Sequence, residues 1–169
     1  MKWRELAPIL IRKGTPRRLK GKIYRACVRS AMLYGSETWA MREEDIRRME
    51  RADMRMIRWM CGISLLDRKT SEEVRESIGV ERLDVVMRRR RLRWYGHLER
   101  MGENAGVRRA RDLEVVGDRG RGRPRTRWMD VVECDMRRMG LRREETQDLL
   151  QWRGRRLLWQ LRPARERLT

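Results

Sequence analysis

Apolar residues recur every three or four positions along most of this chain, and a glycine follows several of these stretches. This period matches one face of an α-helix, and glycine directly after a helix is a common C-terminal stop. The strict alternation of apolar and polar residues that marks a half-buried strand is nearly absent. The sequence therefore predicts an all-α fold of several short amphipathic helices joined by Gly-terminated turns.

The sequence also predicts where these helices begin and end. Thr70 and Glu73 have the spacing of a capping box, in which each side chain bonds the backbone N–H of the other residue. Gly62 and Gly140 stand where two of the helices should stop. The expected helices span residues 15–35, 43–61, 70–79, 83–101, 105–115, 128–140 and 144–161.

The first expected helix has one apolar face and one cationic face. Its apolar stripe consists of Leu19, Ile23, Ala26, Cys27, Ala31 and Tyr34. On the cationic face, Lys20, Lys22 and Arg25 are candidates for contact with phosphate groups.

A basic Gly/Arg/Pro loop at 117–127 interrupts the helical pattern. Glycine and proline disfavour helix and strand there, and arginine occupies alternate positions, namely Arg119, Arg121, Arg123, Arg125 and Arg127. Such a segment can bind phosphates without regard to sequence. Residues 121–124 also match the core of an AT-hook, in which an extended Arg-Gly-Arg enters the narrow minor groove of A·T-rich DNA. A solvated linker is a third interpretation.

The expected helix at 83–101 carries a second basic cluster, formed by Arg88, Arg89, Arg90, Arg91 and Arg93. Aromatic residues follow directly, and aromatic rings stack on unpaired bases while arginines hold phosphates. Trp94 falls on the apolar stripe of this helix, so we expect it in the core. Tyr95 lies off the stripe and is the expected stacking residue.

The charge of the chain favours a polyanionic partner. Its 44 Lys and Arg residues against 25 Asp and Glu residues leave a formal charge of +19, which favours RNA or DNA as partner. The chain is 40% apolar with seven tryptophans, unlike a disordered tail. It shows neither a signal peptide nor an apolar run of about 20 residues. We therefore expect an intracellular protein, nuclear or cytoplasmic, without a membrane partner.

The sequence offers no arrangement suited to catalysis or metal binding. His97 is the only histidine, no second His or Cys lies at metal-ligand spacing, and the aspartates include no adjacent pair. Cys27, Cys61 and Cys134 are widely separated, which disfavours a disulfide framework and a zinc knuckle. We expect no catalytic residue, no metal, no cofactor and no small-molecule substrate.

Five motifs in a fixed order carry a resemblance to a known family. They are LKGKIY at 19–24, AMLYGSETW at 31–39, MRMIRWMCG at 54–62, RWYGH at 93–97 and RGRPRTRW at 121–128. Together they resemble the C-terminal part, the thumb and beyond, of RTE-like non-long-terminal-repeat retrotransposon reverse transcriptases. In that family, the catalytic aspartates of the palm lie upstream of the matched part, and an N-terminal endonuclease domain cleaves the target. The resemblance thus implies a piece of an RNA-directed DNA polymerase without its catalytic centre.

The expected organisation combines these observations. We predict a thumb-like helical module at 1–62, a second basic helical module at 63–116, the basic loop at 117–127 and a C-terminal helical pair at 128–169. By analogy with the family, such a chain would hold template RNA or an RNA–DNA hybrid beside a palm domain that it lacks. The predicted function is non-catalytic nucleic-acid binding. The alternatives are an inert truncated transposon remnant and an AT-hook-like minor-groove binder.

Overall fold

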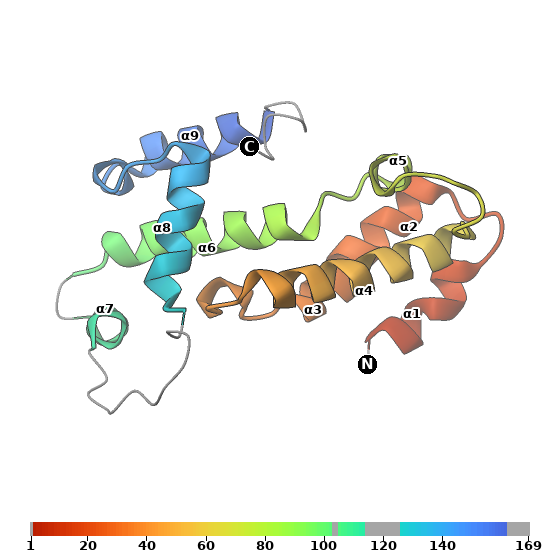
Figure 1. The fold of residues 1–169 in the computed structure, drawn as a ribbon, viewed down its shortest axis with the longest axis horizontal. Coiled ribbons are helices and arrows are strands. Elements are labelled where there is room, and N and C mark those ends of the chain that lie inside the picture. The colour runs from red at the N-terminus through yellow and green to blue at the C-terminus, as the bar shows by residue number, and fades with distance from the viewer. Residues whose placement is uncertain (1, 103–104, 114–125, 162–169) are drawn as a thin grey trace. The chain divides into compact units, whose positions relative to one another are not determined.

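The computed structural model of the chain describes residues 2–102, 105–113 and 126–161, and these residues are mostly helical (Figure 1). No strand occurs within these ranges. The predicted all-α fold is therefore confirmed. The α-helices are α1 (Lys2–Ile11), α2 (Arg17–Ile23), α3 (Ser30–Met32), α4 (Glu43–Cys61), α5 (Ser71–Ile78), α6 (Leu83–Glu99), α7 (Gly106–Asp112), α8 (Trp128–Met139) and α9 (Leu149–Leu161).

Local sequence signals set several helix ends as predicted. α4 has the predicted bounds, and Gly62 after it adopts a left-handed φ of 64°, which residues with a side chain rarely adopt. At the start of α5, Thr70 Oγ1 accepts a hydrogen bond from the backbone N–H of Glu73 at 3.2 Å. The Glu73 carboxylate accepts one from the N–H of Thr70 at 2.8 Å. The predicted capping box is thus confirmed.

Other elements differ from the prediction. α1 was not among the expected helices, and Pro8 lies inside it. The expected helix at 15–35 consists of α2, a π-helical turn η1 (Tyr24–Arg29) and the single turn α3. α7 ends at Asp112, and residues 114–115 lie outside the described ranges. The expected C-terminal helix begins as a 3₁₀ turn, η3 (Glu144–Thr146), before α9.

Most of the apolar stripe predicted for the first helix is wrong, although Ile23 of this stripe packs against the core. Leu19 and Tyr34 are exposed, Tyr34 to 85%. The buried face instead carries Lys20, Gly21, Tyr24, Val28, Arg29 and Leu33. Two of these residues are cationic, so a search for apolar spacing alone selects the neighbouring face. The π-helical turn at Tyr24–Arg29 also departs from the 3.6-residue period that the prediction assumed.

The chain forms two compact units, one of Met1–Ser36 with Arg42–Met87 and the other of Glu37–Met41 with Arg88–Thr169. The predicted boundary after residue 62 does not match this division. α5 contributes Val74 and Ile78 to the same core as Ile57 and Met60 of α4. The boundary between the units falls within α6.

A buried polar network accompanies the apolar core of the first unit. Asp53 of α4 is fully buried, and its carboxylate accepts hydrogen bonds from the Tyr24 hydroxyl at 2.8 Å and from Arg29 Nη2 at 2.6 Å. Arg29 also donates to the backbone carbonyl of Glu81 at 2.7 Å. Through Tyr24 and Arg29, Asp53 thus ties the π-helical turn to α4.

The core of the second unit is built around Trp152 of α9, which is fully buried. Its indole N–H donates to the backbone carbonyl of Leu92 at 3.2 Å, and its ring contacts Tyr95 edge-on at 6.3 Å between centroids. Tyr95 also contacts Trp128 of α8 at 6.3 Å. α6, α8 and α9 therefore share one aromatic core.

Candidate nucleic-acid interface

The run of four arginines on α6 divides between two faces of the helix. Arg88 Nε lies 3.1 Å and Arg91 Nη1 2.5 Å from the two carboxylate oxygens of Asp135 on α8. Both arginines are buried, Arg91 being only 2% exposed. The predicted phosphate contacts by Arg88 and Arg91 are therefore corrected, because their guanidinium groups are used in a buried ion pair inside the unit.

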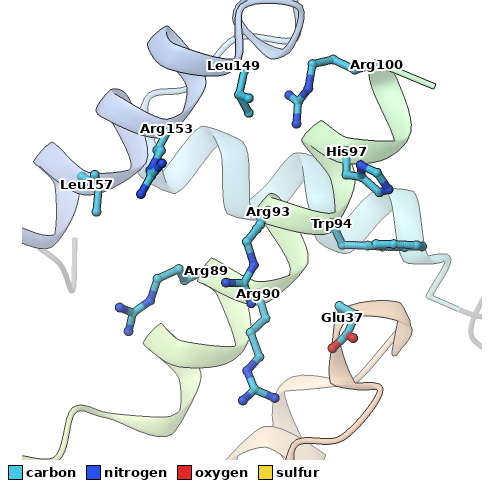
Figure 2. A pocket seen from close by; sticks show the side chains of 10 residues that line it. All are labelled: Glu37, Arg89, Arg90, Arg93, Trp94, His97, Arg100, Leu149, Arg153 and Leu157. Carbon is cyan, nitrogen blue, oxygen red and sulfur yellow. The ribbon is translucent and has the colours of Figure 1, made fainter.

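The other arginines of this cluster line a pocket on the opposite face of α6 (Figure 2). Arg89 and Arg90 are half-buried and Arg93 is exposed. Arg100 follows just after the helix, and one of its guanidinium nitrogens donates to the backbone carbonyl of Thr146 at 2.7 Å. The pocket has a volume of about 580 Å³, within the range of about 300–1,000 Å³ typical of ligand sites.

α9 and the short 3₁₀ turn η2 (Ser36–Thr38) complete the pocket. Leu149, Arg153 and Leu157 are four residues apart, so they lie on one face of α9, and all three are exposed. Glu37 is the one carboxylate among the lining residues. Its segment is held within this unit because Trp128 Nε1 donates to the Glu37 carbonyl at 2.8 Å.

Electrostatics favour an anion in this pocket. Five of the ten lining residues are arginines, against the single acid Glu37. Neither Arg93 nor Arg153 pairs with a carboxylate among the residues described. Like charges held close together repel one another, and a bound anion relieves that repulsion.

The burial expected for Trp94 and Tyr95 is reversed in the structure. Tyr95 is 1% exposed, and burial raises the pKa of its hydroxyl above the ordinary value, with the nearby Glu99 adding to the rise. A base therefore has no access to its ring, and the prediction of Tyr95 as the stacking residue is corrected. Trp94 is half-buried and lines the pocket. Its ring lies 5.4 Å from that of His97, at an angle of 44°.

The candidates in the first helical segment also differ from one another. Lys20 is buried, and its ammonium group donates to the carbonyl of Met60 at 2.8 Å, near the end of α4. Its predicted contact with phosphate is corrected for this reason. Lys22 and Arg25 are exposed, so a phosphate contact by these two residues stays a prediction.

The basic loop lies largely outside the described residues, which include none of Arg119, Arg121, Arg123 and Arg125. Arg127 is described and exposed, directly before α8. Its backbone N–H donates to the Asp130 carboxylate at 2.7 Å.

Sequence reasoning missed the part of the pocket that α9 and η2 supply. Arg100, Arg153 and Glu37 were not among the expected site residues. The spacing of Leu149, Arg153 and Leu157 marks a common helix face, but only the tertiary fold shows that this face meets the arginines of α6.

Among the described residues, no helix is both long and apolar enough to cross a bilayer. Comparisons of this chain with protein-family models, with curated proteins and with solved structures gave no match.

Proposed function

We propose that this chain is a non-catalytic nucleic-acid-binding fragment that holds the sugar-phosphate backbone through the α6–α9 pocket. The observation that carries the proposal is the gathering of Arg89, Arg90, Arg93, Arg100 and Arg153 around a cavity that also contains Trp94. Arginine binds phosphate oxygens in a fixed, often bidentate geometry. The net charge of +19 extends the attraction beyond the pocket.

The resemblance to the C-terminal part of retrotransposon reverse transcriptases fits this proposal. In a parent polyprotein the pocket would contact template RNA or an RNA–DNA hybrid, and a palm domain would perform the polymerisation. The proposed partners of this chain are accordingly RNA or DNA and such a palm domain.

A salt titration of oligonucleotide binding tests the proposal. Fluorescence anisotropy with labelled RNA and DNA should show log affinity falling linearly with log salt, by about 0.7 to 0.9 for each phosphate neutralised. The double variant R93E/R153E should bind at least about tenfold more weakly, with a shallower salt slope. Failure of the wild-type chain to bind at about 20 mM salt would overturn the proposal, since counterion release is strongest in dilute salt.

A matched control separates the pocket from net charge. R51E/R55E makes the same change in charge on exposed positions of α4, in the other unit. We expect this variant to retain most of its affinity. An equal loss in both double variants would show that total charge, and not the pocket, drives binding. A third variant, R121Q/R123Q/R125Q, measures the share of the basic loop.

Exposed apolar residues favour a second candidate, a remnant whose apolar surface once packed against another domain. Leu66 is 91% exposed, and Leu65 and Trp59 of the same unit are also exposed. Such a remnant should bind a hydrophobic dye and aggregate as the isolated chain, whereas a sharp cooperative unfolding transition would contradict this candidate.

A further inference from the structure

We infer that the α6–α9 pocket takes an unpaired nucleotide, with its base stacked on Trp94, and that the chain therefore prefers single-stranded to duplex nucleic acid. This inference rests on the proposed function and adds the substrate class of the same site.

The pocket combines cationic and apolar side chains. A purely phosphate-binding surface needs only cations, but this pocket also presents the side chains of Leu149 and Leu157 and the indole of Trp94. Figure 2 shows Leu149 and Leu157 on either side of Arg153 along α9, and Trp94 next to Arg93 on α6. A nucleotide has the matching combination, because it joins a flat, weakly polar ring to an anionic phosphate.

The fold covers the Trp94 side chain only in part. Trp94 is half-buried and belongs to the pocket wall, so part of its side chain is accessible while its backbone is fixed in α6. His97 lies one turn further along and restrains the indole from one side. A ring held in this way can bind a base at low entropic cost, because its side chain loses little conformational entropy on binding.

A duplex and a single strand differ in which surfaces of a base a protein can reach. In a duplex, each base has both faces covered by its neighbours, so a protein reaches only base edges and backbone. An aromatic ring in a concave pocket can contact the face of a base only when that base has left the stack. An unpaired nucleotide therefore satisfies the arginines and Trp94 together, whereas a duplex satisfies the arginines alone.

The experiment compares W94L and W94F, using oligonucleotides of one length that carry 2-aminopurine, a base whose fluorescence falls on stacking. Single-stranded RNA, single-stranded DNA and duplex DNA form the three arms. We expect the wild-type chain to bind a single strand about tenfold more tightly than the duplex and to quench 2-aminopurine. W94L should lose about tenfold in single-strand affinity and lose the quenching, with duplex affinity and salt slope unchanged. W94F should restore both losses in large part, because phenylalanine also stacks.

The control is W59L, which removes an exposed tryptophan from α4 in the other unit and should leave binding unchanged. Circular dichroism melts show whether each variant is folded, and W94F provides the test if W94L is not.

Equal binding of single strand and duplex by the wild type would overturn this inference and leave the proposed function standing. Loss of affinity by W94L for duplex and single strand alike would do the same. Absence of binding in every arm would overturn both. The two single-stranded arms identify whether RNA or DNA supplies the nucleotide.

Discussion

Consecutive arginines of α6 lie in two different environments, a buried ion pair and the wall of a pocket. Arg88 and Arg91 end at Asp135, whereas Arg89 and Arg90 line the pocket. The position of each residue around the helix axis determines which of the two environments its side chain enters. The sequence contains no local sign of this difference, because the partner Asp135 is more than forty residues away.

Replacing Asp135 by asparagine should destabilise the fold. The substitution leaves two buried guanidinium groups without a compensating charge, which typically costs about 3–5 kcal/mol. Urea denaturation followed by circular dichroism measures the loss. D112N is the matched control, since the Asp112 side chain is 58% exposed in its pair with Arg111, and solvent-exposed pairs contribute little to stability. A D135N variant as stable as D112N would show that the ion pair contributes little.

Glu50 of α4 provides a prediction of pH dependence. Burial and the neighbouring Asp84 raise the pKa of the Glu50 carboxyl, although Arg82 lies 3.5 Å away. The folded state therefore favours the protonated form, and this stabilisation is present below the ordinary pKa and is lost as pH rises through the folded one.

Because glutamine resembles the protonated form, E50Q should be more stable than the wild type at pH 7, by up to about 1 kcal/mol. The difference should shrink as pH falls from the raised folded pKa toward the ordinary carboxyl pKa, and it should be largely gone at pH 4. Urea midpoints at pH 7 and pH 4 provide the measurement. A variant less stable than the wild type at pH 7 would mean that the pair with Arg82 outweighs burial.

At the scale of elements, two helices meet closely at a glycine. A Cβ atom on Gly96 of α6 would overlap the indole of Trp152 on α9. The motif RWYGH thus contains its glycine because α9 packs directly on the α6 backbone there. In the first unit, a Cβ on Gly21 of α2 would overlap the backbone carbonyl of Ile78 at the end of α5.

G96A should therefore destabilise the second unit by about 1–3 kcal/mol, because overpacking forces the buried Trp152 to move. G154A is the matched control, since nothing lies within 4 Å of a Cβ there. This substitution should stabilise α9 by about 0.5–1 kcal/mol, because alanine loses less backbone entropy in a helix. Thermal denaturation of both variants checks the opposite signs, and two shifts of the same sign would contradict the argument.

How far the elements could be predicted depends on where their signals lie. α4 and α5 were predicted closely, because acids in the first turn, a capping box and terminal glycines are local features. The π-helical turn η1 and the buried face of α2 were not, because Lys20 and Arg29 owe their burial to Met60 and Asp53 on α4. Likewise, the sequence marked the arginines of α6 as a site, but their division into buried and lining residues depends on α8 and α9.

At the scale of the whole molecule, the net charge of +19 shapes stability as well as binding. Without nucleic acid, repulsion among cations opposes the compact state, and added salt screens this repulsion over about 10 Å at 0.1 M. The melting temperature of the free chain should therefore rise between about 20 and 200 mM sodium chloride. Differential scanning fluorimetry measures the shift, with potassium glutamate as the control salt. A falling melting temperature would show that surface ion pairs outweigh the repulsion.

The hydrogen bond from Trp128 to the Glu37 carbonyl has a consequence for dissecting the molecule. Residues 37–41 belong to the C-terminal unit, although the chain on both sides of them belongs to the other unit. A fragment that begins at residue 88 would therefore lack Glu37 in the pocket wall. It would also leave the Trp128 indole N–H without its hydrogen-bond acceptor, the Glu37 carbonyl. The smallest fragment that retains the site must therefore include residues 37–41 as well as the chain from residue 88 onward.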